Sequence, residues 1–416
     1  MLGRLHALLR RPAASDERAS AARLEDRLRD RRNNFDVLRL VAASFVLFSH
    51  SYALTASPEP LADVSGWTFG EIGVVMFFAM SGFLIAKSWG EQPHLVPFSV
   101  KRGLRLLPAL AVAVTVTTFV VGPLFTTLPL SSYLTDPTTW IYWIRSSLLV
   151  TFAGTLPGVF LTNPYPNAVN GSLWTLPVEA CCYGMVAVLG LLALLRRSVL
   201  LAAGGLLLLL CVTPLAPFAK ASAGGTTSGN LTLVIMLIAT FVLGSLAYSV
   251  RSRLRLSWIV VVVLMIVWVV TWDSGWVRAT GVLAIAFTVL VFAFRTPAWL
   301  RRLTAPGDVS YGIYVYAFPV QQSVAAIWHS VDPLVMFAIA YPVTYGLAFL
   351  SWRIIERPAL AYKRVVAPRR PEPARQVESP DGAHDADGSR SEGAGPGLLG
   401  GAALRGGTHG ERRGDA

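Results

Sequence analysis

Long apolar segments separated by short polar stretches make up most of the chain. Each apolar segment is close to the ~20 residues that an α-helix needs to cross a bilayer. The pattern therefore predicts an all-α fold, that of a polytopic integral membrane protein with about ten transmembrane helices. The predicted spans are residues 36–56, 70–89, 104–124, 174–195, 199–217, 230–250, 257–272, 277–294, 310–329 and 333–354.

Basic residues are distributed unequally among the polar stretches. With a cytoplasmic N-terminus, the outer loops hold only Arg145 and Lys220, with Arg278 at an outer helix end. This asymmetry follows the positive-inside rule, and it supports ten spans because a missed span would reverse the sign halfway along the chain. An even number of spans places both termini in the cytoplasm. The inner loops hold Lys101, Arg102, Arg196, Arg197, Arg251, Arg253, Arg255, Arg295, Arg301 and Arg302.

Three regions follow from this pattern. Residues 1–34 are a basic cytoplasmic arm, either solvated or lying on an anionic leaflet. Residues 35–365 form the transmembrane domain, whose outer connection at about 125–173 contains an apolar piece better suited to an interfacial or re-entrant helix than to a span. Residues 366–416 lack aromatic side chains and are rich in Gly, Pro and charged residues, which predicts a disordered cytoplasmic tail.

Composition narrows the function classes. The 416 residues are 54% hydrophobic and 14% charged, with a mean hydropathy of +0.54, values far from those of a soluble domain. The net charge of +12 comes from arginines between spans and in the two tails, so no nucleic-acid partner is expected. Cys181, Cys182 and Cys211 lie in apolar segments without metal-ligand spacing, so neither a disulfide framework nor a metal site is expected.

Two ionisable residues of the first span, Arg39 and His50, are the first candidates for a site. Such residues are costly in lipid and usually face a bundle interior or a wet cavity. They lie about 16 Å apart along the helix. Arginine binds phosphate bidentately and histidine takes up a proton near neutral pH, so an anionic cofactor held at Arg39 can place its reactive end at His50. Alternatively, Arg39 is a topology anchor and His50 a hydrogen-bonded packing residue.

Glu179 is the second candidate, because it is expected at the same depth as His50. Each lies about six residues inside the outer end of its predicted span. A carboxylate beside an imidazole orients it and stabilises the imidazolium, which makes the histidine an effective general base toward a hydroxyl. The alternative is a neutral glutamic acid that forms a hydrogen bond between helices.

Arg102 and Arg105 are candidates for a phosphate site where the chain re-enters the membrane after Lys101. Three residues apart, they share one helical face, and clustered cations at a helix start favour phosphate. Positive-inside topology is the alternative, although it explains Arg105, one turn further in, less well. Weaker candidates for substrate binding are Trp174, which can stack on a sugar ring, and Ser310, Tyr311 and Tyr314, although interfacial aromatics are also common membrane anchors.

Six motifs, in this order, resemble those of the acyltransferase 3 family and cover about residues 33–365. They are the Arg39/His50 pair, GVVMFFAMSGFLI (73–85), KRGLRLLPAL (101–110), GSLWTLPVE (171–179), SYGIYVYAFPV (310–320) and IIERPAL (354–360). The family consists of ten-span enzymes of the bacterial inner membrane that move acyl groups, commonly acetyl from acetyl-CoA, onto sugar hydroxyls. The acceptors are exopolysaccharides, lipopolysaccharides, peptidoglycan or glycosylated metabolites, which can be lipid-linked.

The resemblance assigns roles to individual residues. It implies that His50 is catalytic, with Arg39 as its partner, and that Arg102 and Arg105 bind the acyl-CoA co-substrate. No permanently bound cofactor is implied. The route is either direct attack of the hydroxyl on the thioester or a relay through an acyl-histidine.

Two positions depart from the family pattern. Ala317 stands where many members have a second histidine, and Val75 stands where many have an acidic residue. A mechanism that needs the second histidine is therefore not available to this chain. The competing hypotheses are a transporter or flippase that uses His50 and Glu179 as a proton relay, and a scaffold without activity.

Overall fold

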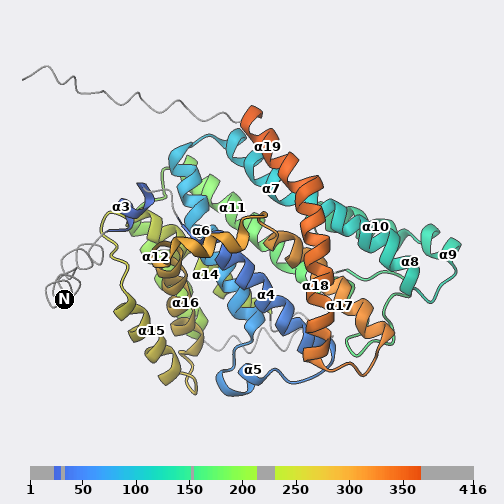
Figure 1. Cartoon of the computed structure of the whole chain (residues 1–416). Coiled ribbons are helices and arrows are strands. Elements are labelled where there is room, and N and C mark those ends of the chain that lie inside the picture. Colours follow the sequence, from blue (N-terminus) through green and yellow to red (C-terminus); the bar gives the residue numbers. More distant parts are fainter. Residues whose placement is uncertain (1–22, 30–32, 151–153, 213–229, 367–416) are drawn as a thin grey trace, which may run out of the picture. The chain divides into compact units, whose positions relative to one another are not determined.

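The computed structural model describes residues 23–29, 33–150, 154–212 and 230–366. Within these residues the secondary structure is helical, apart from isolated single-residue bridges that pair Arg23 with Arg255 and Thr126 with Val159. The prediction of an all-α fold is confirmed (Figure 1). Most of the predicted N-terminal arm and nearly all of the predicted disordered tail lie outside the described residues.

Each of the ten predicted spans corresponds to a helix. In the described part of the chain, seven helical segments are long and apolar enough to cross a membrane, so this is a multi-pass membrane protein. The count of ten spans and the position of the termini stay predictions. The helices are α4 (Phe35–Leu54), α6 (Phe69–Glu91), α7 (Leu95–Val116), α11 (Thr175–Leu191), α12 (Arg197–Val212), α14 (Asn230–Ser249), α15 (Trp258–Val270), α16 (Val277–Arg295), α17 (Ser310–Ile327) and α18 (Pro333–Ser351).

Local sequence explains where several helices begin. Thr68 and Glu71 form a capping box at the start of α6, in which each side chain accepts a hydrogen bond from the other residue's backbone N–H. Asp332 caps α18 with its side chain alone, since its Oδ1 accepts a hydrogen bond from the backbone N–H of Leu334. Asn170 caps the 3-10 turn η2 (Gly171–Trp174), which leads directly into α11. These caps satisfy N–H groups that a helix start leaves without a partner.

Glycines fix α6 closely against its neighbours α4 and α14. A Cβ on Gly73 would lie 2.6 Å from the carbonyl oxygen of Ala42 in α4, and one on Gly82 would collide with the backbone of Phe241 in α14. Small residues are common where membrane helices approach this closely, because dispersion contacts between backbones replace the missing hydrophobic driving force. The face of α6 that lines the site is therefore held in one orientation.

A buried amide fixes α17 against α4. Gln321 Nε2 donates hydrogen bonds to the carbonyl oxygen of Leu47 at 2.9 Å and to Ser51 Oγ at 2.8 Å. Because an unpaired amide is costly in an apolar environment, this contact sets the register of the two helices. Figure 1 shows α4, α17 and α18 side by side.

The connection at 125–173 contains short helices instead of a span. With 11 residues, α10 (Pro137–Ser147) is too short to cross a bilayer. It exposes Trp140, Ile141 and Ile144, which favours the predicted interfacial helix. The remaining elements are α3 (Leu24–Arg29), α5 (Pro60–Ser65), η1 (Thr117–Val121), α8 (Gly122–Phe125), α9 (Leu130–Thr135), η4 (Ala298–Thr304), η5 (Trp352–Glu356) and α19 (Arg357–Val366).

Candidate active site

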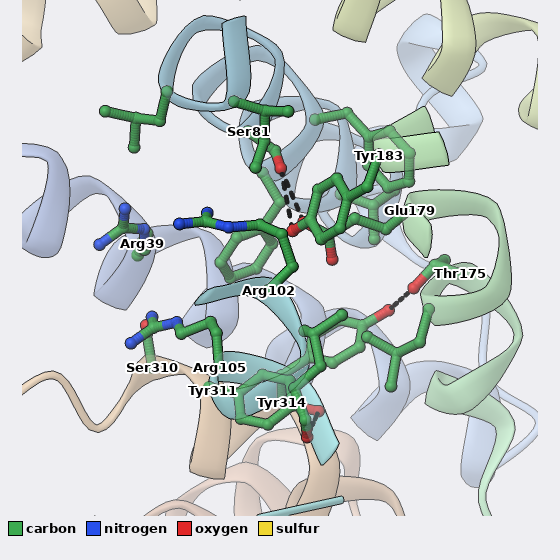
Figure 2. A pocket seen from close by; sticks show the side chains of 17 residues that line it. Arg39, Ser81, Arg102, Arg105, Thr175, Glu179, Tyr183, Ser310, Tyr311 and Tyr314 are labelled. Atoms are coloured by element: carbon green, nitrogen blue, oxygen red, sulfur yellow. Dashed lines mark hydrogen bonds between the residues drawn. The ribbon is translucent and has the colours of Figure 1, made fainter. Parts of the chain in front are cut away.

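A cavity of about 100 Å³ lies among α4, α6, α7, α11 and α17 (Figure 2). Apolar side chains of α6 and α11 form part of its wall, and charged and hydroxyl groups form the rest. Polar groups of this kind inside a membrane bundle mark ligand and substrate sites. The polar lining residues are Arg39, Ser81, Arg102, Arg105, Thr175, Glu179, Tyr183, Ser310, Tyr311 and Tyr314.

The cavity brings together seven of the nine predicted site residues. Arg39, Arg102 and Arg105 lie on one side of it in Figure 2, and Glu179 lies across from them. The two predicted residues outside the lining are His50 and Trp174, of which Trp174 is half-buried at the end of η2. The helices thus collect the arginines predicted for anion binding into one site.

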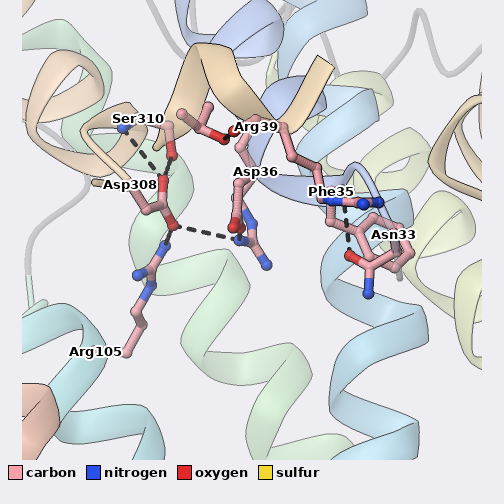
Figure 3. A network of polar contacts seen from close by, with 9 residues as sticks. Asn33, Phe35, Asp36, Arg39, Arg105, Asp308 and Ser310 are labelled. Atoms are coloured by element: carbon pink, nitrogen blue, oxygen red, sulfur yellow. Dashed lines mark hydrogen bonds and ion pairs between the residues drawn. The ribbon is translucent and has the colours of Figure 1, made fainter. Parts of the chain in front are cut away.

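Asp308, in the loop before α17, joins two of these arginines (Figure 3). Its Oδ2 lies 2.5 Å from Arg105 Nη2 and 3.3 Å from Arg39 Nη1. Ser310 Oγ donates a hydrogen bond of 2.5 Å to Oδ1, and Asp36 Oδ1 lies 2.6 Å from the same Nη1 atom of Arg39. Burial alone would raise the pKa of Asp308, but the two guanidinium groups outweigh it and hold the pKa well below its usual range. The carboxylate is therefore ionised at neutral pH.

Arg102, one turn before Arg105 on α7, has a different environment. Its side chain lines the cavity, and its Nε is buried with no hydrogen-bond partner among the described residues. Arg105, in contrast, forms an ion pair with Asp308. A half-buried guanidinium without such a pair is available to an anionic ligand, which it can bind through two parallel N–H groups.

Glu179 is bound to hydroxyl groups of two helices. Its Oε1 accepts a hydrogen bond of 2.7 Å from Ser81 Oγ of α6 and one of 2.5 Å from Tyr183 OH, one turn further along α11 (Figure 2). Neither bond goes to His50. The carboxylate contributes instead to the electrostatic environment of Arg102 across the cavity.

Hydroxyl groups also close another wall of the cavity. Tyr314 OH shares a hydrogen bond of 2.5 Å with Thr175 Oγ1 and donates one of 2.9 Å to the carbonyl oxygen of Ser172. Tyr311 OH donates to the carbonyl oxygen of Leu106 at 2.8 Å. These bonds connect α17 to η2, α11 and α7, so the tyrosines hold the cavity together.

His50 lies beyond this cavity, against α17. Its ring packs edge-on against Phe318 with 5.1 Å between ring centroids. The Nδ1 atom is buried and has no hydrogen-bond partner in the described part of the chain. An unpaired imidazole nitrogen in a buried position is costly, so it marks a place where a substrate group can complete the hydrogen bonding.

No hydrogen bond joins His50 and Glu179, the pair that the sequence suggested. Glu179 Oε1 is bound by Ser81 and Tyr183, and His50 Nδ1 has no partner among the described residues. That the two residues lie at the same membrane depth stays a prediction.

Sequence comparison identifies the family. The acyltransferase domain matches residues 32–353, well over half of the chain. The chain belongs to the acyltransferase 3 family. It is 30% identical over 337 residues to an O-acetyl transferase of Shigella phage Sf6, which covers 78% of this chain and 95% of that protein. It is also 30% identical over 377 residues to Nodulation protein 10 of Rhizobium leguminosarum bv. viciae, with 82% and 96% covered. No solved structure matches.

The acyltransferase packs its two unusual positions against apolar neighbours. Ala317 is 1% exposed in a cluster with Ala43 of α4 and Ala348 of α18. Val75 is fully buried in the main core. A histidine at position 317 would need more space than these small side chains leave.

The sequence did not point to three polar residues that line the cavity, Ser81, Thr175 and Tyr183, nor to Asp308 beside it. The three lining residues are expected inside apolar spans, where nothing in a single sequence separates them from packing residues. Asp308 offered a signal, since it is an acidic residue two positions before Ser310 at the same predicted membrane side as Arg39 and Arg105.

Proposed function

We propose that this acyltransferase moves an acetyl group from acetyl-CoA to a hydroxyl group of a carbohydrate, such as an exopolysaccharide, a lipopolysaccharide or a glycosylated metabolite. The observation that carries the proposal is the arginine side of the cavity, where Arg102 presents to an anion a guanidinium whose buried Nε has no hydrogen-bond partner among the described residues. A donor with several phosphate groups suits this site. The name of the phage relative, an O-acetyl transferase, supports acetyl as the group and oxygen as the acceptor atom. We infer that the enzyme resides in the bacterial cytoplasmic membrane.

The donor lies along the bundle in this proposal. Its phosphate groups bind beside Arg39, Arg102 and Arg105, and its pantetheine arm follows the apolar wall formed by α6. Arg39 and His50 are on the same helix, about 16 Å apart. The thioester therefore reaches the level of His50 while the phosphates stay at the arginines. Acetyl-CoA is a co-substrate that leaves as CoA, and no resident cofactor is needed.

His50 is the proposed general base. It takes the proton of the acceptor hydroxyl, and the oxygen attacks the thioester carbonyl carbon. The C–S bond breaks, CoA leaves as a thiolate, and the proton on the imidazole passes to the sulfur. In the relay alternative, an imidazole nitrogen attacks the thioester first, the C–S bond breaks and the CoA thiolate leaves. The acceptor oxygen then attacks the acetyl carbon, the C–N bond to the imidazole breaks, and the hydroxyl proton passes to the freed imidazole nitrogen.

The remaining candidate residues are proposed to contact the acetyl-CoA donor or the sugar acceptor. Glu179 is proposed to act on the donor side of the reaction, since its hydrogen bonds and its charge are directed into the arginine cavity. Ser310, Tyr311 and Tyr314 line that cavity and shape it around the donor. Trp174, half-buried at the end of η2, is the proposed stacking surface for a sugar ring of the acceptor.

The test uses purified full-length protein with acetyl-CoA carrying a labelled acetyl group. Methyl glycosides and polysaccharide fragments serve as acceptors, and release of CoA is followed with a thiol reagent. The expected result is CoA release that depends on a glycan, together with label on that glycan. An absence of CoA release with every acceptor would contradict the proposal.

A further inference from the structure

The three arginines of the cavity have unequal partners. Arg39 and Arg105 both pair with the same carboxylate oxygen of Asp308, at 3.3 and 2.5 Å. The guanidinium of Arg102 has no ion pair or hydrogen bond among the described residues. The side chains of Arg39, Arg105 and Asp308 are 21%, 22% and 11% exposed, so this ion-pair cluster is largely shielded from solvent.

We propose that Asp308 is a positioning residue, which immobilises Arg39 and Arg105 so that Arg102 is the arginine that directly contacts a phosphate group of the donor. This inference rests on the proposed function. It gives Arg102 the direct phosphate contact and gives Arg39 and Arg105 a structural role beside it. Asp308 touches no reacting atom in this arrangement. It acts through the two guanidinium groups, which become fixed parts of the cavity wall.

Asp308 itself is firmly held. Its second oxygen accepts a hydrogen bond from Ser310 Oγ at 2.5 Å (Figure 3). Ser310 is the first residue of α17, so the loop that carries Asp308 is joined to a helix of the bundle. A carboxylate with both oxygens engaged cannot turn away to release either arginine, and the rotamer entropy that a free arginine would lose on binding is already lost.

A second buried carboxylate restrains Arg105 further. Glu356 is 3% exposed, belongs to the π-helical turn η5, and attracts Arg105 electrostatically. Such turns insert an extra residue into a helix and often redirect a side chain at a functional site. Arg105 thus faces two carboxylates, and a donor phosphate would have to compete with both.

Arg102 faces weaker competition, because Glu179 attracts it electrostatically but forms no ion pair with it in the described part of the chain. The carboxylate across from it, Glu179, has its Oε1 engaged by Ser81 and Tyr183. A phosphate group can therefore approach Arg102 without breaking an ion pair. Charge-assisted bonds between guanidinium and phosphate are among the strongest polar contacts in proteins.

The experiment measures binding of CoA and of pantetheine, which lacks the phosphates, to detergent-solubilised full-length protein by calorimetry. Removing a hydrogen bond to a charged group should weaken CoA binding by about 10- to 100-fold in Arg102→Gln. Asp308→Asn should weaken it by about 10-fold, because Arg39 and Arg105 lose their alignment. Asp308→Glu should recover most of that loss. Pantetheine binding should stay unchanged in all three variants, since neither role involves the neutral arm.

A matched control is Glu71→Gln, which removes a carboxylate from the ion pair with Arg278 (3.0 Å) outside the cavity. It should leave CoA binding unchanged. If Asp308→Asn does not fold, Ser310→Ala tests the same point by releasing the carboxylate while keeping its charge, and should weaken CoA binding by about threefold.

Tighter binding of CoA by Asp308→Asn than by the wild type would overturn the inference. If Asp308 merely competes with the phosphate, Asp308→Asn frees two guanidinium groups and CoA binds more tightly. Equal loss of CoA and pantetheine binding would show a general structural role instead, which also overturns it. If the wild-type protein binds pantetheine and CoA equally, or neither, the proposed donor itself is wrong. If instead the wild type prefers CoA over pantetheine and Asp308→Asn keeps the same preference, the donor is correct and only the role of Asp308 is wrong.

Discussion

The two ends of the site differ in how their polar groups are paired. The arginine end contains Arg39, Arg102, Arg105 and Asp308, and the histidine end contains His50 and Phe318. At the arginine end, Asp308, Arg39 and Arg105 pair among themselves. At the histidine end, His50 packs against an aromatic ring and leaves Nδ1 without a partner in the described residues. Under the proposed function, the site that holds a highly charged donor is assembled in advance, whereas the site of the chemical step leaves a hydrogen bond for the reacting hydroxyl to supply.

One helix connects the two ends. Ser310, Tyr314 and Phe318 follow one another at intervals of four residues, so they form a stripe on one face of α17. Ser310 binds Asp308, Tyr314 binds Thr175 and Phe318 supports His50. In the proposed function, the distance between donor recognition and chemistry is therefore set by two turns of a single helix, and a shift of α17 would move both ends together.

The largest effect is expected at the histidine end, from His50→Ala. Loss of a general base typically lowers the rate by about 10²- to 10⁴-fold, so acetyl transfer to the glycan should fall by that factor. CoA affinity should stay within about twofold, because His50 is not part of the cavity lining. Single-turnover acetyl transfer and calorimetry with CoA measure the two quantities separately. Transfer at the wild-type rate would remove His50 from the mechanism and leave the donor site unaffected.

A smaller effect, at the arginine end, is expected from Glu179→Gln. The amide oxygen still accepts the hydrogen bonds of Ser81 and Tyr183, but the negative charge opposite Arg102 is lost. Removing that charge should favour the anionic donor, and the KM for acetyl-CoA should fall by about fivefold with kcat less affected. Initial rates at varied acetyl-CoA decide the point.

A fall in kcat at constant KM would instead support the pairing of Glu179 with His50 that the sequence suggested. If Glu179 orients His50, kcat should fall about as much as in His50→Ala while the KM for acetyl-CoA stays constant. Tyr183→Phe serves as a comparison, because it removes one hydrogen bond to Glu179 and keeps the charge. A change of KM in Glu179→Gln alone would tie the effect to charge.

The sequence predicted most of the arginine end and only part of the histidine end. Apolar runs of bilayer length define the spans, and Arg39, Arg102 and Arg105 meet because each lies near the same predicted membrane side of its span. The pairing of Glu179 with His50 stays a prediction. The hydrogen bonds of the Glu179 carboxylate go to Ser81 and Tyr183, and hydropathy does not determine which neighbour a buried side chain contacts. Asp308 was missed because hydropathy does not determine the path of a loop.

The smallest effect concerns the pH dependence of the ion-pair cluster. In the folded protein the pKa of Asp308 is below its ordinary value of about 4. Its stabilising contribution is therefore complete above that ordinary value and is lost only as the pH falls through the lowered pKa. Asp308→Asn should reduce stability by about 1–3 kcal/mol, between the values for exposed and buried pairs.

This reduction should be the same at pH 8 and at pH 5, as measured by the difference in melting temperature between wild type and Asp308→Asn in detergent. Other groups titrate equally in both proteins and cancel in the difference. A difference that shrinks between pH 7 and pH 5 would mean that Asp308 takes up a proton in this range. The arginine end would then resemble the histidine end, with a polar group that changes state during the reaction, and the contrast between a preassembled donor site and an adaptable chemical site would fail.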